Sequence, residues 1–169
     1  SAIARDVEVP GTEAPRLAPK AACYFFVVAA VTIAIAIPLL SHLSLHTPGW
    51  ATFLILGGIA AVAQLFVVRT PRNQSYHTTI VFLIPAAMLL PPELVVLIAV
   101  AMHIPEWLKS RSAWYIQIFN ICNWTLSMLA AYGAFHGFLG MGSGDFNYAI
   151  AGLAAAASIV AVNHLLMAP

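Results

Sequence analysis

The stretch 21–40 contains no charged residue and is predominantly apolar. As a helix rising about 1.5 Å per residue, it would be about 30 Å long, the thickness of a bilayer's hydrocarbon core. Further apolar runs follow along the chain, so hydrophobic residues make up 62% of it and charged residues only 8%. Ordinary soluble domains are about 45–50% apolar and about 25% charged. The sequence therefore predicts an all-α integral membrane protein whose surroundings are the lipid bilayer.

Six apolar segments are expected to cross the membrane, at about 21–40, 50–68, 78–90, 93–108, 114–139 and 146–167. The third and fourth are short and are joined at a Pro-Pro turn, Pro91-Pro92, where a helix cannot continue. They form either two broken or tilted membrane helices or one re-entrant hairpin. Residues 1–19 mix charged residues with prolines and predict a flexible cytoplasmic tail, which leaves 20–169 as the transmembrane helical domain.

The basic residues all fall on one side of this arrangement. They lie in the tail or in the second and fourth connections: Arg5, Arg16, Lys20, Arg69, Arg72, Lys109 and Arg111. The other three connections hold Glu93 and Asp145 and no lysine or arginine. Since cytoplasmic loops are enriched in lysine and arginine, both termini are predicted in the cytoplasm, as in a multi-pass protein of the inner cell membrane. The net charge of +1 gives no indication of a nucleic-acid partner.

A polar stripe on the fifth segment is the first candidate for a ligand-binding site. Its members are spaced by three, three and four residues, which places them along one helical face: Gln117, Asn120, Asn123 and Ser127. A polar face turns toward the bundle interior, because polar groups in lipid cost free energy unless they are paired. Hydrogen bonds between helices, typically worth about 0.6–2 kcal/mol each, are the simpler interpretation. A ligand pocket or an ion path is the alternative.

Three further candidates each have a structural alternative. His103 and Glu106 share a face of the fourth segment, but the second histidine of an HExxH zinc motif is missing. Glu106 can instead pair with a lysine or arginine at the membrane interface. Glu93 follows the Pro-Pro turn, where the helix dipole favours a carboxylate. The remaining polar residues of the spans are isolated and are interpreted as packing groups: Gln64, His136, Asn163 and His164.

The sequence contains no recognisable catalytic constellation. It has no mid-span lysine for a retinal Schiff base, no GxSxG, no glycine-rich phosphate loop and no mid-membrane pair of carboxylates. Cys23 and Cys122 lie in apolar runs and are predicted to be buried, reduced thiols, without metal-ligand spacing. The chain alone is therefore expected not to be an enzyme, and no metal site is predicted. The sequence does not identify a cofactor.

Residues 50–131 resemble the N-terminal membrane domain of certain bacterial, chiefly actinobacterial, signalling proteins. The resemblance lies in Leu-Leu-Pro-Pro-Glu at 89–93, His-Ile-Pro-Glu-Trp at 103–107 and Phe-Asn-Ile-Cys-Asn at 119–123. In those proteins a bundle of transmembrane helices precedes a cytoplasmic HD-GYP phosphodiesterase or GGDEF diguanylate cyclase domain. The resemblance implies a sensory, input or anchoring domain linked to cyclic-di-GMP turnover, with a catalytic domain following in a longer protein.

Two other hypotheses remain open at this point. Broken helices beside a polar stripe are also a feature of transporters, which makes a small-molecule-binding subunit of a membrane transporter the first alternative. An accessory subunit of a larger membrane complex, with no ligand of its own, is the second. Other membrane subunits or a second copy in a homodimer are the protein partners that these hypotheses allow.

Overall fold

The computed structural model describes residues 18–66, 68–69, 75–76, 79–110 and 113–168, so the predicted tail lies almost entirely outside the described residues. The described chain is helical apart from one short antiparallel pairing of β1 (Val68–Arg69) with β2 (Ser75–Tyr76). The helices are α1 (Pro19–Leu40), α2 (Trp50–Gln64), α3 (Ile80–Leu89), α4 (Pro92–Ala101), α5 (His103–Ser110), α6 (Trp114–Leu139) and α7 (Asp145–Met167). The all-α prediction is confirmed.

Two of the predicted segments differ from the helices that form. The second segment ends as a helix at Gln64, short of residue 68. The fourth is divided into α4 and α5, which meet at Met102. Pro105 accounts for this break, because proline has no N–H to donate to the carbonyl of Ala101 and its ring clashes with that carbonyl. The turn between α3 and α4 lies at Leu90–Pro91, one residue before the predicted Pro91-Pro92, because Pro92 is already the first residue of α4.

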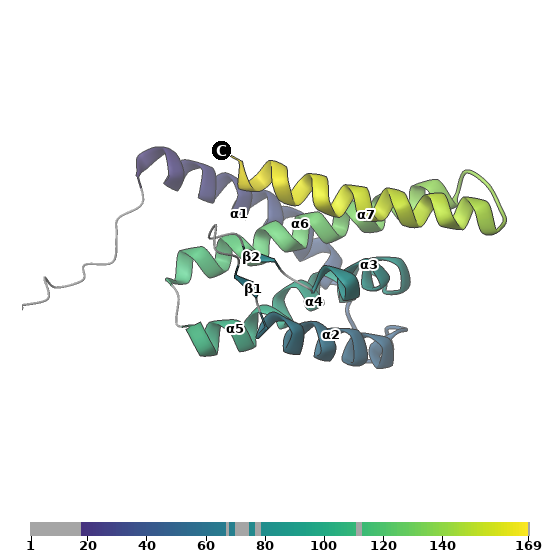
Figure 1. The fold of residues 1–169 in the computed structure, drawn as a ribbon, viewed down its shortest axis with the longest axis horizontal. Coiled ribbons are helices and arrows are strands. Elements are labelled where there is room, and N and C mark those ends of the chain that lie inside the picture. The colour runs from purple at the N-terminus through teal and green to yellow at the C-terminus, as the bar shows by residue number, and fades with distance from the viewer. Residues whose placement is uncertain (1–17, 67, 70–74, 77–78, 111–112, 169) are drawn as a thin grey trace, which may run out of the picture.

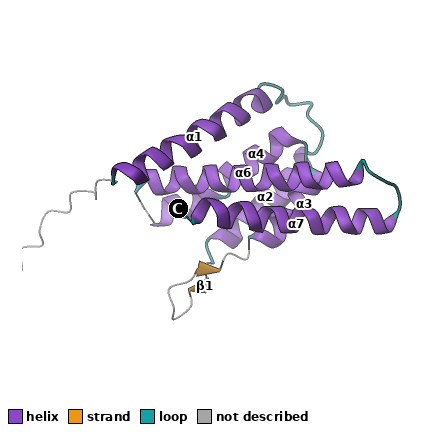
Figure 2. Cartoon of the chain, turned by 90° about the horizontal axis from the view of Figure 1, so that it is seen from above, coloured by secondary structure: helices purple, strands orange, loops and turns teal. Residues whose placement is uncertain are grey.

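Helix α6 lies at the centre of the bundle. It packs along α7 as an antiparallel hairpin and also contacts α1, α3, α4 and α5 (Figure 1). Seen from above, α1 and α7 lie on opposite sides of α6, and α1 diverges from α6 toward its C-terminal end (Figure 2). The longest helix is therefore the one most enclosed by the others.

The chain runs back and forth between two ends of the bundle (Figure 1). At one end the connection 41–49 reaches the α3–α4 turn, and a Cβ on Gly49, whose φ is +96°, would lie 3.4 Å from Leu90 Cδ2. At the other end the Phe25 and Trp114 rings stack edge to face at 6.1 Å, and Lys109 Nζ donates to Leu65 O at 3.2 Å. We call this second end, which holds Lys20 and Lys109, the basic end.

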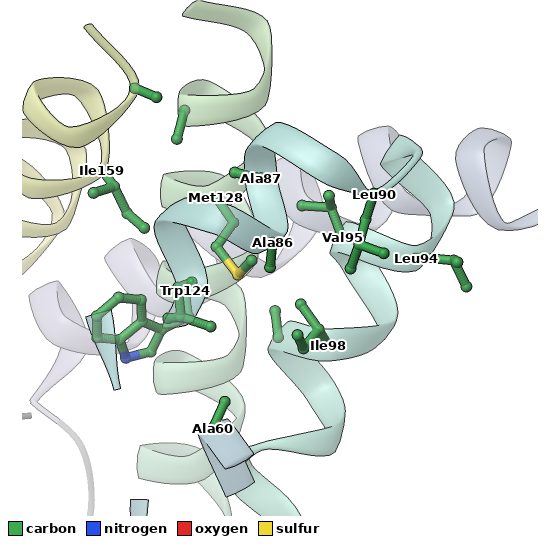
Figure 3. Close-up of a cluster of buried hydrophobic side chains, with 14 of the residues drawn as sticks. Ala60, Ala86, Ala87, Leu90, Leu94, Val95, Ile98, Trp124, Met128 and Ile159 are labelled. Carbon is green, nitrogen blue, oxygen red and sulfur yellow. The ribbon is translucent and has the colours of Figure 1, made fainter. Parts of the chain in front are cut away.

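The interior contains many small side chains beside larger apolar ones such as Phe135 and Trp124. Fully buried alanines come from α2, α3, α4, α6 and α7: Ala60, Ala86, Ala87, Ala99, Ala131, Ala151 and Ala155. Met128 of α6 extends toward Ala86 of α3, with Trp124 and Ile98 nearby (Figure 3). Small side chains let helix backbones approach closely, and this is the packing mode typical of helices in lipid.

Large apolar side chains are also exposed on the exterior. Phe26 on α1 is 65% exposed and Leu54 on α2 is 67% exposed. Within the described residues, α1 and α7 are long and apolar enough to cross a membrane, while α2 and α3 are shorter apolar helices. Helix α6 is longer than either but contains the polar stripe, which the surrounding helices largely enclose. The fold thus has a partly polar interior and an apolar surface.

Candidate functional site

The polar stripe of α6 faces inward, as the sequence predicts, except at one position. Gln117, Asn123 and Ser127 are buried, whereas Asn120 is half-buried. Asn123 Nδ2 donates to Oδ1 of Asn163 on α7, which pairs two side chains separated by 40 residues. Asn123 Oδ1 and Ser127 Oγ are buried with no hydrogen-bond partner among the described residues. Part of the stripe therefore joins α6 to α7, as the interhelical interpretation expects.

A small pocket separates α6 from the α4–α5 break. Its volume is about 260 Å³, and apolar and aromatic side chains of α4, α5 and α6 surround it. His103 and Gln117 both line this pocket, so the structure brings two of the candidate residues together. His103 is 1% exposed, and its Nδ1 lies 2.8 Å from the carbonyl oxygen of Ala99.

Glu106 belongs to a different group of side chains at the basic end. Its Oε2 accepts a 2.8 Å hydrogen bond from Nε2 of Gln64, and Gln64 Oε1 accepts another of 2.8 Å from Thr79 Oγ1. The described residues thus give Glu106 an amide partner instead of the lysine or arginine that was expected. This chain links the end of α2, the start of α3 and α5. Gln64 is only 2% exposed, and nothing in the sequence connects it with Glu106.

A larger pocket of about 610 Å³ lies at the basic end, between the start of α1, the start of α6 and the end of α7. We call it the end pocket; its lining residues are Lys20, Ala21, Tyr24, Phe25, Tyr115, Ile116, Phe119, Asn120, Leu166 and Met167. The walls are mainly apolar and aromatic, and no carboxylate is among them. Asn120 is the stripe residue that reaches this pocket. Pockets of about 300–1,000 Å³ with apolar walls and a few polar groups are typical ligand sites.

Three polar side chains of the end pocket have no hydrogen-bond partner among the described residues: Lys20, Tyr115 and Asn120. The fourth, Tyr24, donates from its hydroxyl to the backbone carbonyl of Leu166 at 2.8 Å. This bond crosses from α1 to α7, and elsewhere in the described chain these two helices do not pack against each other. The end pocket therefore occupies the place where α1 and α7 approach.

The last candidate, Glu93, is not brought to either pocket. It lies half-buried in the first turn of α4, at the end of the bundle opposite the basic end. Among the described residues no group of three His, Cys, Asp or Glu side chains could hold a metal ion. Both cysteines are free, but only Cys122 is buried. The prediction for Cys23 is wrong, because its side chain lies on the outward face of α1 rather than against α6.

The residues of the end pocket were largely missed by the sequence reasoning. Tyr24, Phe25 and Phe119 are aromatic residues within apolar runs, and such residues are abundant in this chain. The one available signal was the clustering of Lys20, Tyr24 and Tyr115 near segment ends, where interfacial residues gather. Comparison of the chain with protein-family models, with curated proteins and with solved structures gives no match.

Proposed function

We propose that this chain is a multi-pass, membrane-embedded input domain of a bacterial signalling protein linked to cyclic-di-GMP turnover. The membrane assignment is supported by the many large apolar side chains exposed on the outside of the bundle, while the polar Gln64, Gln117 and Asn123 are buried between the helices. Exposure of so many large apolar side chains is unfavourable in water and favourable in lipid. Helix α6 then crosses the bilayer enclosed by its neighbours, which is where polar residues of a membrane helix are tolerated.

The proposed topology has six crossings, with α4 and α5 together forming the fourth and both termini in the cytoplasm. The α3–α4 turn lies beside Gly49, so it extends as far as the start of α2. This position supports two membrane crossings for α3–α5 and not a re-entrant hairpin. The common location of Lys20 and Lys109 supports a cytoplasmic basic end.

The observation that carries the input role is the end pocket between α1, α6 and α7. A ligand in this pocket contacts the first and last helices of the bundle at once. The ligand therefore binds with different affinity to two arrangements of the bundle that differ in the spacing of α1 and α7. Such a difference in affinity is what allows a ligand to shift a conformational equilibrium. In the proposed protein, α7 passes this change to a cytoplasmic domain that makes or degrades cyclic-di-GMP. The link to cyclic-di-GMP rests on the resemblance of residues 50–131.

The proposal is tested by filling the end pocket in the chromosomal gene. Ala21 and Ala34 are both exposed on α1, but only Ala21 lines the end pocket, so the indole of Ala21→Trp is expected to fill the pocket and that of Ala34→Trp is not. Cellular cyclic-di-GMP is measured in both strains and in the wild type, at equal protein levels in the membrane fraction. We expect a changed level in Ala21→Trp and a wild-type level in Ala34→Trp. Equal levels in all three strains would contradict the input role.

A second candidate function is a small-molecule-binding subunit of a membrane transporter. The observation that favours it is the interrupted α4–α5 helix beside the small pocket of His103 and Gln117, because interrupted helices border the substrate sites of many transporters. In that case Ile121→Trp, which narrows the small pocket, reduces uptake of a substrate by intact cells and leaves cyclic-di-GMP unchanged. Unchanged uptake in Ile121→Trp, together with a changed cyclic-di-GMP level in Ala21→Trp, favours the input domain.

A further inference from the structure

We infer that the end pocket binds a membrane lipid with an anionic headgroup, with an acyl chain between α1, α6 and α7 and the headgroup at Lys20. The inference names the ligand class of the site and so rests on the proposed membrane function. It follows from three properties of the pocket: the chemistry of its walls, the sign of its charge and its position in the bundle.

The walls suit a flexible hydrocarbon chain. Tyr24 and Phe25 from α1, Phe119 from α6 and Leu166 from α7 present apolar surface to the same space. The volume of about 610 Å³ lies within the range of drug-sized ligand pockets, about 300–1,000 Å³, and accommodates part of a lipid. Ile116 and Met167 at the pocket are exposed on the outside of the bundle, so the pocket opens toward the apolar surroundings. An apolar ligand can therefore enter sideways from the bilayer.

The polar groups of the pocket favour an anion. Lys20 is the only charged residue among the described lining residues, and no acidic side chain offsets it there. The Tyr115 hydroxyl and the Asn120 amide have no protein partner in the described chain and can donate to phosphate or ester oxygens. Hydrogen bonds from such donors become stronger when the acceptor is ionised. A zwitterionic headgroup would instead place its own cation beside the ammonium of Lys20.

The position of the pocket matches the depth and the leaflet of such a headgroup. Lys20 and Tyr24 lie in the first turns of α1, and Trp114 and Tyr115 begin α6, so cationic and aromatic side chains gather at one level of the bundle. Tyrosine, tryptophan and lysine are enriched at the membrane interface. Anionic lipids are concentrated in the cytoplasmic leaflet, where basic pockets between transmembrane helices bind their headgroups. The proposed topology places the basic end in that leaflet.

A lipid bound in this way joins α1 to α7 beside their single described hydrogen bond, from Tyr24 to Leu166. Its acyl chain fills the space between the two helices, and its headgroup holds the start of α1 near the start of α6. The spacing of α1 and α7 then depends on the anionic lipid content of the cytoplasmic leaflet. The input domain would thus report membrane composition.

The test is photocrosslinking of the full chain in phosphatidylcholine nanodiscs. One set contains a trace of phosphatidylglycerol with a diazirine in its acyl chain, and the other contains phosphatidylcholine with the same labelled chain. After illumination, adducts are mapped by mass spectrometry of peptides. We expect the phosphatidylglycerol adducts to concentrate on residues 20–25, 115–120 and 166–167, and to exceed the phosphatidylcholine adducts there by about fivefold, the effect of about 1 kcal/mol per lysine near an anionic surface.

Two pairs of variants separate the site from general lipid contact. Lys20→Gln should lose the preference for phosphatidylglycerol, whereas Lys109→Gln, at the same end but outside the pocket, should keep it. Ala21→Trp should lose the adducts of both lipids in the pocket, whereas Ala34→Trp should keep them. Circular dichroism and a monodisperse elution profile establish that each variant is folded.

Adducts spread evenly over the outer faces of α1 and α7, or equal labelling by the two lipids, would overturn the inference. The proposed input role would still stand if Ala21→Trp changed the cellular level of cyclic-di-GMP. In that case the end pocket would bind a ligand other than an anionic lipid. The reverse outcome, specific phosphatidylglycerol adducts without any effect of Ala21→Trp on cyclic-di-GMP, would establish a lipid site and refute the input role.

Discussion

The hydroxyl of Tyr24, near the start of α1, donates a 2.8 Å hydrogen bond to the backbone carbonyl of Leu166, in the last turn of α7. The two residues are 142 positions apart in the sequence. This carbonyl belongs to the final turn of a helix, where no amide further along the helix can reach it. The bond thus caps the end of α7 with a side chain from α1 and fixes the approach of the two helices at the end pocket.

Replacing this hydroxyl should loosen the end of α7. Tyr24→Phe keeps the ring against Phe119 but removes the donor, and a hydrogen bond of this kind contributes about 0.5–1.5 kcal/mol. We expect the amides of the last turn of α7 to exchange with deuterium a few-fold to about tenfold faster, measured by mass spectrometry in nanodiscs. Tyr148→Phe, at the other end of α7, is the matched control. Identical exchange in Tyr24→Phe and wild type would show that the bond does not hold the helix end.

Removing Gln64 should destabilise the contact of α2 with α3 and α5. In Gln64→Leu the buried Thr79 hydroxyl and the Glu106 carboxylate both lose their partner, at a cost of about 1–3 kcal/mol. Glu106→Gln retains an acceptor oxygen and should cost less. The measurement is reversible unfolding in mixed micelles with increasing dodecyl sulfate. An equal or smaller loss in Gln64→Leu than in Glu106→Gln would contradict the role given to this hydrogen-bonded chain.

The close approach of α2 to α4 predicts different effects at two adjacent glycines. A Cβ on Gly57 would already lie 3.4 Å from Ile98 Cγ1, so Gly57→Leu should overpack the interface and destabilise the fold by about 1–3 kcal/mol. A Cβ on Gly58 meets nothing within 4 Å, so Gly58→Leu should be tolerated. Thermal denaturation in detergent compares the two variants. Equal melting temperatures for both would mean that α2 does not pack on α4 through Gly57.

The Asn123–Asn163 pair should contribute modestly to the packing of α6 on α7. Double-mutant cycles of such pairs in membrane proteins give about 0.6 kcal/mol on average. We therefore expect a coupling of this size from a cycle with Asn123→Leu, Asn163→Leu and the double variant, measured by unfolding in mixed micelles. Strictly additive effects of the two substitutions would contradict a direct interaction.

Much of the helical architecture could be predicted from the sequence, because apolar runs and proline positions are local signals. The turn beside Pro91 and the helices 114–139 and 146–167 follow from these signals to within a residue or two. The break between α4 and α5 was harder to predict from the sequence. Pro105 lies in an apolar stretch that reads as one segment, and the helix break occurs three residues before it, at Met102.

The pairing of side chains across helices could not be predicted. Gln64 and Asn163 appear in the sequence as isolated polar residues, and each proves to be the partner of a candidate residue far along the chain. Helical spacing shows which residues share one face of one helix, but not which neighbouring helix that face meets. For the same reason, the shared face of the α6 stripe does not show that its residues meet different neighbours. In the structure Gln117 lines the small pocket, Asn120 lines the end pocket and Asn123 bonds to α7.

The central claim, a multi-pass membrane domain with a cytoplasmic basic end, is tested most directly by cysteine accessibility. Single cysteines are introduced at Leu45, Ser143 and Lys109 in a Cys23→Ser/Cys122→Ala background and are exposed in intact cells to a membrane-impermeant maleimide. Leu45 and Ser143 are exposed residues of the two connections opposite the basic end, and Lys109 is exposed at the basic end. We predict labelling at 45 and 143 in intact cells, and at 109 only after the membrane is opened. Equal labelling of all three positions in intact cells, or recovery of the protein in the soluble fraction, would contradict the account.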